Sequence, residues 1–109
     1  MQMNDKRYSV IKSRLLLLSK EEIQRIVDNI DLVCFDTFNF DEESKKYCPL
    51  AIATNLHNTI KNPTNNLIQL ELSKRFNPVN AIRGVEGTFY RSDRKNDLIK
   101  ICKEVLCIK

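Results

Sequence analysis

Cys48 is the residue of this sequence whose type and position could support covalent chemistry. It directly precedes Pro49, a common first residue of helices, and the peptide dipoles at a helix N-terminus favour a reactive thiolate. Such a nucleophile needs a base, and the one histidine of the chain, His57, follows nine residues later. On one continuous helix the two would stand about 13 Å apart along the axis, which excludes a Cys48–His57 pair unless the helix breaks. The alternative is that Cys48 is a small buried packing residue.

The four cysteines do not have the spacing of a metal site. Neither Cys34 and Cys48 nor Cys102 and Cys107 form the two-residue knuckle of zinc motifs, so we expect no metal and no cofactor. The longest apolar block, residues 15–18, is too short for a membrane span or a signal-peptide core. We therefore expect reduced thiols in a cytoplasmic protein that does not contact membranes. The abundance of asparagine and cysteine favours a mesophilic source.

Basic and aromatic side chains gather near the two glycines of the chain. The candidate nucleic-acid surface consists of Arg83, Tyr90, Arg91, Arg94 and Lys95. Side chains of these types can bind phosphates and stack on exposed bases. Residues 72–109 also hold nine basic and four acidic residues, the largest positive excess along the chain. The alternative is an ordinary solvated face, because Asp93 and Asp97 dilute the positive field.

The four residues 84–87, Gly-Val-Glu-Gly, resemble the loop with which KH domains clamp a nucleic-acid backbone. The resemblance covers these residues alone. Because Glu86 would repel phosphate and the flanking residues are typical of extended chain, we expect a plain turn that uses glycine for positive φ. The sequence has no P-loop, dinucleotide fingerprint or nucleophile elbow, and this absence disfavours a conventional enzyme.

A second candidate surface is acidic. It consists of Asp36, Asp41, Glu42 and Glu43. This set could bind a basic site on another protein, as in an accessory or inhibitor protein of a phage or mobile element. The alternative is a solvated charged turn, which favours solubility.

Hydrophobic periodicity predicts the elements that position these residues. Each predicted helix has an apolar stripe, and the stripes are Tyr8, Ile11, Leu15 and Leu18; Ile23, Ile26, Val27 and Ile30; Leu67, Leu70 and Phe76 with Ile68 and Leu72; and Leu98, Ile101, Cys102 and Val105. Capping residues are expected at Ser19 with Glu22, at residues 62–64, and at residues 92–93. We expect one buried helix from Pro49 to near His57.

The remaining segments predict a small sheet. Residues 33–40 alternate as a strand, residues 41–46 form a turn without glycine, and Tyr47 begins a return strand or leads into the helix. Residues 79–91 read as two short strands or an ordered loop.

The sequence therefore predicts a single compact α+β domain over residues 1–109. Four or five helices pack around an antiparallel sheet made from the Phe35 region and the residues flanking Gly84 and Gly87. The leading functional expectation is a small cytoplasmic binding or regulatory protein without catalysis that contacts nucleic acid through residues 83–95. Protein interaction through the acidic residues of segment 36–43 comes second. A thiol enzyme centred on Cys48 comes third.

Overall fold

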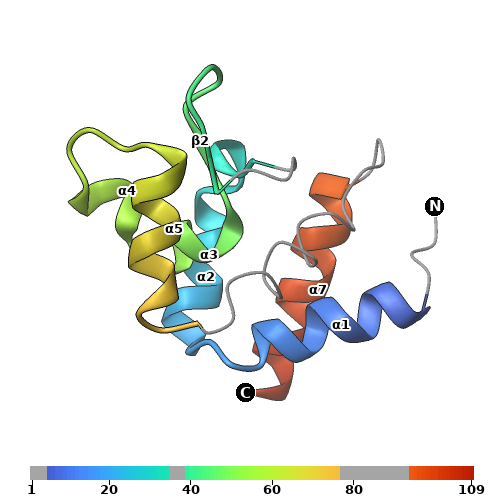
Figure 1. Ribbon diagram of the computed structural model, residues 1–109. Helices are drawn as coiled ribbons and strands as arrows, with labels where there is room; N and C mark the ends of the chain where they lie inside the picture. Colours follow the sequence, from blue (N-terminus) through green and yellow to red (C-terminus); the bar gives the residue numbers. More distant parts are fainter. Residues whose placement is uncertain (1–4, 35–38, 77–93) are drawn as a thin grey trace.

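The computed structural model describes residues 5–34, 39–76 and 94–109, and it has an α+β fold (Figure 1). Its α-helices in these ranges are α1 (Asp5–Leu15), α2 (Lys20–Asp28), α3 (Pro49–Ala53), α4 (Leu56–Thr59), α5 (Asn65–Ser73) and α7 (Arg94–Ile108). The other elements are a 3-10 turn, η1 (Ile30–Leu32), and the strands β1 (Phe40–Asp41) and β2 (Lys46–Tyr47). The predicted fold class is confirmed, with six described helices rather than four or five.

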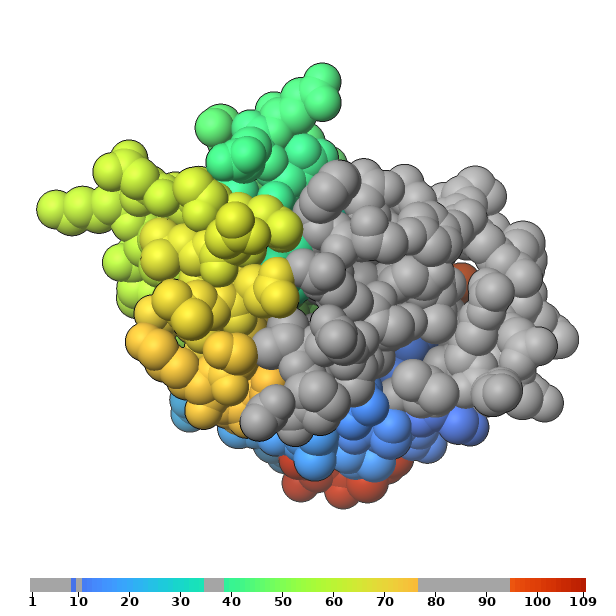
Figure 2. Space-filling model, in the orientation of Figure 1, coloured from blue at the N-terminus to red at the C-terminus, as the bar shows by residue number. Residues whose placement is uncertain are grey.

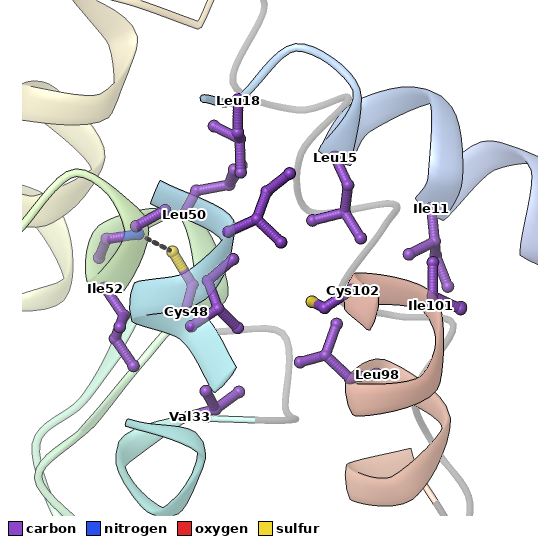
Figure 3. Packing of buried hydrophobic residues seen from close by; sticks show 14 of the residues in the cluster. Ile11, Leu15, Leu18, Val33, Cys48, Leu50, Ile52, Leu98, Ile101 and Cys102 are labelled. Atoms are coloured by element: carbon purple, nitrogen blue, oxygen red, sulfur yellow. Dashed lines mark hydrogen bonds between the residues drawn. The ribbon is translucent and has the colours of Figure 1, made fainter. Parts of the chain in front are cut away.

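Helices α1, α2, α3 and α7 enclose a shared hydrophobic core. α3 packs against α2, while α7 packs against both α1 and α2. Figure 3 shows labelled side chains from α1, α3 and α7 in this core. The buried aliphatic side chains of α1, α2 and α7 are Ile11, Leu15, Ile23, Ile26, Leu98, Ile101 and Val105. Each contributes about 1.5–3 kcal/mol. They confirm the predicted stripes of α2 and α7 and the described part of the α1 stripe, whereas the side chain of Tyr8 lies outside the description.

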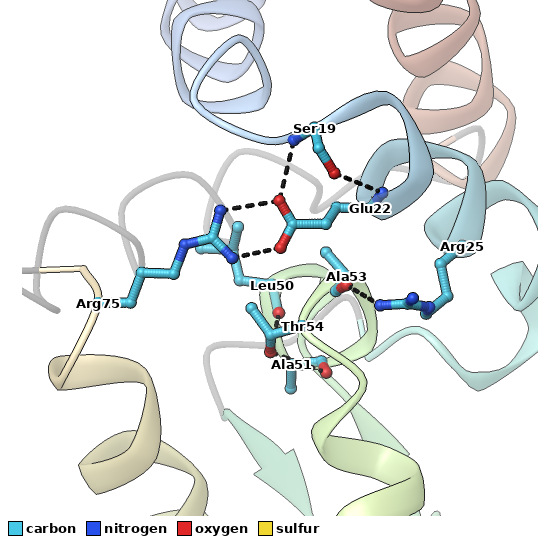
Figure 4. Close-up of polar contacts among 8 residues, drawn as sticks. All are labelled: Ser19, Glu22, Arg25, Leu50, Ala51, Ala53, Thr54 and Arg75. Atoms are coloured by element: carbon cyan, nitrogen blue, oxygen red, sulfur yellow. Dashed lines mark hydrogen bonds and ion pairs between the residues drawn. The ribbon is translucent and has the colours of Figure 1, made fainter.

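Helix α2 begins with the predicted capping box. Ser19 Oγ accepts a hydrogen bond from the Glu22 amide at 3.2 Å, and Glu22 Oε1 accepts one from the Ser19 amide at 2.9 Å. Arg75, beyond the end of α5, also donates to both carboxylate oxygens of Glu22, with Nη2 at 2.8 Å from Oε1 (Figure 4). The hydrogen bonds from Arg75 lower the pKa of Glu22 to about 2. One carboxylate thus connects the start of α2 to the chain after α5.

The predicted helix from Pro49 to His57 is wrong as a single helix. Its first part, α3, is buried as expected, but Asn55 adopts a left-handed conformation with φ of 68° and separates it from α4. Thr54 Oγ1 donates to the Leu50 carbonyl at 2.8 Å, and Arg25 donates to the Ala53 carbonyl (Figure 4). The Leu50 carbonyl also accepts its helical bond from the Thr54 amide, whereas the Ala51 and Ala53 carbonyls, which a continuing helix would use, accept from Thr54 Oγ1 at 3.3 Å and from Arg25. Asparagine also tolerates the left-handed region.

The sheet is a hairpin between β1 and β2. The strands pair antiparallel, with Phe40 opposite Tyr47 and Asp41 opposite Lys46. Of the predicted strand 33–40, Val33 forms an isolated bridge to Tyr47, and β1 begins only at Phe40 and includes Asp41. A four-residue loop follows, in which Lys45 takes the positive φ of 59°. β2 includes Tyr47, so of the two predicted readings of that residue the return strand is the one observed. Among the described residues β1 pairs with β2, whereas the residues flanking Gly84 and Gly87 lie outside the described ranges.

Helix α5 buries only part of the apolar side that was predicted for it. Thr64 caps it, as expected, by accepting from the Leu67 amide at 3.1 Å. Ile68 and Leu72 are buried, whereas Leu67 is 36% exposed and Leu70 is 59% exposed. The packing of α5 against α3 and β1 selects the face with Ile68 and Leu72, because both residues project from one side of the helix.

Several predicted features lie outside the described residues. These are the strand residues 35–38, the strands or loop of residues 79–91, and the cap at residues 92–93. Across the ranges that the structure does describe, no helix combines the length and the apolar run needed to cross a bilayer.

Candidate functional sites

Cys48 is the N-cap of α3 and belongs to the hydrophobic core. Its Sγ accepts a hydrogen bond from the Ala51 amide at 3.4 Å, and the residue has 0% exposure (Figure 3). Its own amide donates to the Asn39 carbonyl at 2.9 Å, which joins the start of α3 to the hairpin. A buried sulfur that caps a helix matches the packing alternative of the sequence prediction, because a thiol enzyme would require substrate to reach it.

His57 lies on α4, beyond the break at Asn55. The 13 Å separation from Cys48 therefore no longer follows from helix geometry. His57 Nε2 lies 3.2 Å from the side-chain Nδ2 of Asn58, and the ring meets that of Tyr47 edge-on at 6.0 Å between centroids. Burial, followed by the positive charge of Arg25, lowers the pKa of His57 below its usual value. The lowered pKa favours the neutral ring, and the contacts of His57 are those of a partly buried packed histidine.

The other cysteines occupy contrasting positions. Cys34 and Cys102 are buried, Cys107 is exposed, and none of the four cysteines forms a disulfide. Burial raises the pKa of Cys102 to about 12. Within the described ranges, no three histidine, cysteine or acidic side chains are grouped in a way that could hold a metal ion.

The structure describes the end of the predicted nucleic-acid surface. Arg83, Tyr90 and Arg91 lie outside the described residues, and Arg94 is the first residue of α7. Lys95 is exposed, and its Nζ lies 2.6 Å from Oδ1 of Asp31. This hydrogen bond, with the charge of Lys95, lowers the pKa of Asp31. The predicted surface thus reaches the first turn of α7, where an acidic residue already neutralises one of its cations.

The exposed face of α7 holds further basic side chains. Asn96, Ile99, Lys100, Lys103, Glu104 and Cys107 line an open hollow of about 410 Å³ on the side of the helix opposite its buried stripe. Sequence analysis missed this hollow as a site, although the spacing of Asn96, Lys100 and Lys103 places them on one helical face. We call the set of Asn96, Lys100, Lys103 and Cys107 the α7 face.

The acidic surface is the loop of the β1–β2 hairpin, and Figures 1 and 2 show the hairpin projecting from the body of the protein. Asp41 accepts hydrogen bonds from the Glu43 amide at 3.0 Å and from Ser44 Oγ at 2.8 Å, which lower its pKa. Glu42 and Glu43 are exposed beside Lys45, and Asp36 lies outside the described residues. Asp41 therefore shapes the loop, while Glu42 and Glu43 present charge to solvent.

Comparison with protein families, with curated proteins and with solved structures found no significant match to this chain. Its surfaces are therefore the basis for assigning a function.

Proposed function

We propose that this chain is a small, cytoplasmic, non-catalytic binding protein that contacts nucleic acid. The contact surface comprises Arg83, Tyr90, Arg91, Arg94 and Lys95, extended by Lys100 and Lys103 of the α7 face. The observation that carries the proposal is the hollow along α7, because it presents two exposed lysines on one rigid helix. Polyanions bind to such arrays by releasing condensed counterions.

The charges of the α7 face support a negatively charged partner. Among the described residues, Lys100 and Lys103 make no hydrogen bond or ion pair, so their ammonium groups point to water. Glu104 lines the same hollow and Asp97 is half-buried on the same helix, and both reduce the positive field. Two lysines beside one carboxylate give a modest attraction, which binding at low ionic strength would reveal most clearly.

The test is direct binding of labelled nucleic acid by the full chain. Single-stranded and double-stranded DNA and RNA of one sequence are titrated at low ionic strength, and the titrations are repeated with added salt. We expect saturable binding of at least one probe that weakens as salt rises. Absence of binding to every probe at low salt would contradict the proposal.

Matched variants locate the surface. Lys100→Gln/Lys103→Gln removes two charges from the α7 face, and Lys20→Gln/Lys61→Gln removes two charges from exposed lysines elsewhere. We expect the first pair of substitutions to weaken binding and the second to change it little. Equal losses in both variants would show attraction by overall net charge and remove the α7 face from the proposal.

The hairpin loop is a second candidate surface, now for a protein partner. The hydrogen bonds to Asp41 hold the loop in one conformation, so a partner would not have to order it. The proposal predicts a nuclease-resistant partner in a pull-down that the Glu42→Gln/Glu43→Gln variant loses. The control Asp28→Asn/Glu71→Gln removes two carboxylate charges elsewhere and should retain the same partner. Identical sets of bound proteins for both variants would reject the hairpin as the contact.

A further inference from the structure

The α7 face is a straight row on a rigid support. Its four residues follow one another at intervals of four, three and four along a helix of 15 residues, so they share one side and span about 16 Å. The opposite side of α7 is fixed by Leu98, Ile101 and Val105, which are buried against the other helices. The two lysines are therefore held at a fixed spacing, with about 5–6 Å between their Cβ atoms.

The α7 face has no means of stacking on bases. The sequence of α7 contains no aromatic residue. Binding of single strands depends strongly on aromatic stacking, which contributes about 1–3 kcal/mol per base. A single strand laid along α7 would lose conformational freedom and gain only contacts between phosphates and lysines.

Duplex DNA complements such a face better. Its phosphates are already held in a regular array, so the duplex loses little conformational entropy when it binds. Its higher charge density also releases about 0.9 counterions per neutralised phosphate, compared with about 0.7 for single strands. The α7 face offers contacts between cations and phosphates but no stacking. The lower ordering cost and the higher charge density of duplex DNA therefore favour the duplex as its ligand.

We infer that the α7 face binds the phosphate backbone of duplex DNA in preference to single-stranded DNA, with Lys100 and Lys103 as the cations and Asn96 as a further hydrogen-bond donor. This inference rests on the proposed function and specifies its ligand. Phosphate contacts carry no sequence information, so binding through this face is independent of base sequence.

The test compares a labelled 20-base-pair duplex (about two helical turns) with either of its separated strands. Binding to the full chain is measured by fluorescence anisotropy over a series of salt concentrations. We expect tighter binding of the duplex and equal binding of duplexes with scrambled sequence. In Lys100→Gln/Lys103→Gln the slope of log affinity against log salt should fall by about 1.8, because each lost phosphate contact removes about 0.9.

The control Lys20→Gln/Lys61→Gln should retain the wild-type slope, and circular dichroism establishes that both variants keep their helices. Equal or tighter binding of the single strand would overturn this inference while leaving the proposed function standing. An unchanged slope in Lys100→Gln/Lys103→Gln would also overturn it, whichever probe binds better. Failure of the wild-type chain to bind any probe would remove both proposals.

Discussion

Helices α2 and α3 begin in contrasting environments, although the N-cap side chain of each accepts a backbone hydrogen bond. At α2 the exposed Ser19 hydroxyl accepts from the Glu22 amide at 3.2 Å, and two charged side chains extend the network. At α3 the buried Cys48 sulfur accepts from the Ala51 amide at 3.4 Å. A hydroxyl is the stronger acceptor, whereas sulfur costs much less to remove from water. Burial, as well as capping strength, therefore determines which residue suits a helix start.

The largest effect should come from placing a charged cap in the buried position. Cys48→Asp introduces a residue that caps well in water, but here its carboxylate would be buried in the hydrophobic core. We expect the free energy of unfolding to fall by about 3–5 kcal/mol, measured by urea denaturation. The matched Ser19→Asp variant should lose less than about 1 kcal/mol, because aspartate and serine cap exposed helices similarly well. Similar losses at the two positions would contradict the contrast.

A smaller effect should follow removal of the exposed cap. Ser19→Ala leaves the Glu22 amide without its hydroxyl acceptor and should lower the free energy of unfolding by about 0.5–2 kcal/mol in urea. Ser9→Ala, at an exposed position within α1, provides the control and should be neutral or slightly stabilising. A Ser19→Ala protein as stable as the wild type would show that the capping box contributes nothing at α2.

The smallest effect concerns acid pH. The pKa of Glu22 is about 2 in the folded protein, below its ordinary value of 4.5, so the folded state binds this proton more weakly than the unfolded chain. Its stabilising contribution is complete above about pH 4.5 and is lost as the pH falls toward 2. Thermal unfolding midpoints between pH 7 and pH 2 should therefore fall less steeply in Glu22→Gln than in the wild type. Parallel curves would mean that the ion pair with Arg75 does not contribute to stability.

Local sequence signals predicted the parts of the fold that local contacts determine. The capping box at Ser19 involves residues three apart, and the start of α3 at Pro49 follows from the geometry of proline itself. The buried stripe of α7 is strictly periodic, from Leu98 to Val105. Its exposed lysines could be placed from the same pattern, because a helix that buries one side exposes the other.

Contacts between distant residues determine the features that the sequence did not reveal. Arg25 bonds the end of α3 from 28 residues away, and this contact supports the break at Asn55. α5 has apolar side chains on more than one side, so only its packing against α3 and β1 decides that Leu70 is exposed.

The Glu22 carboxylate also has a consequence for how the molecule opens. It binds the first turn of α2 on one side and Arg75, 53 residues away, on the other. If the chain after α5 is released, Glu22 at the start of α2 loses its partner Arg75. If the first turn of α2 frays, Arg75 loses its partner Glu22. Amide protons at these two places should exchange with solvent together, as one cooperative unit that links distant parts of the sequence.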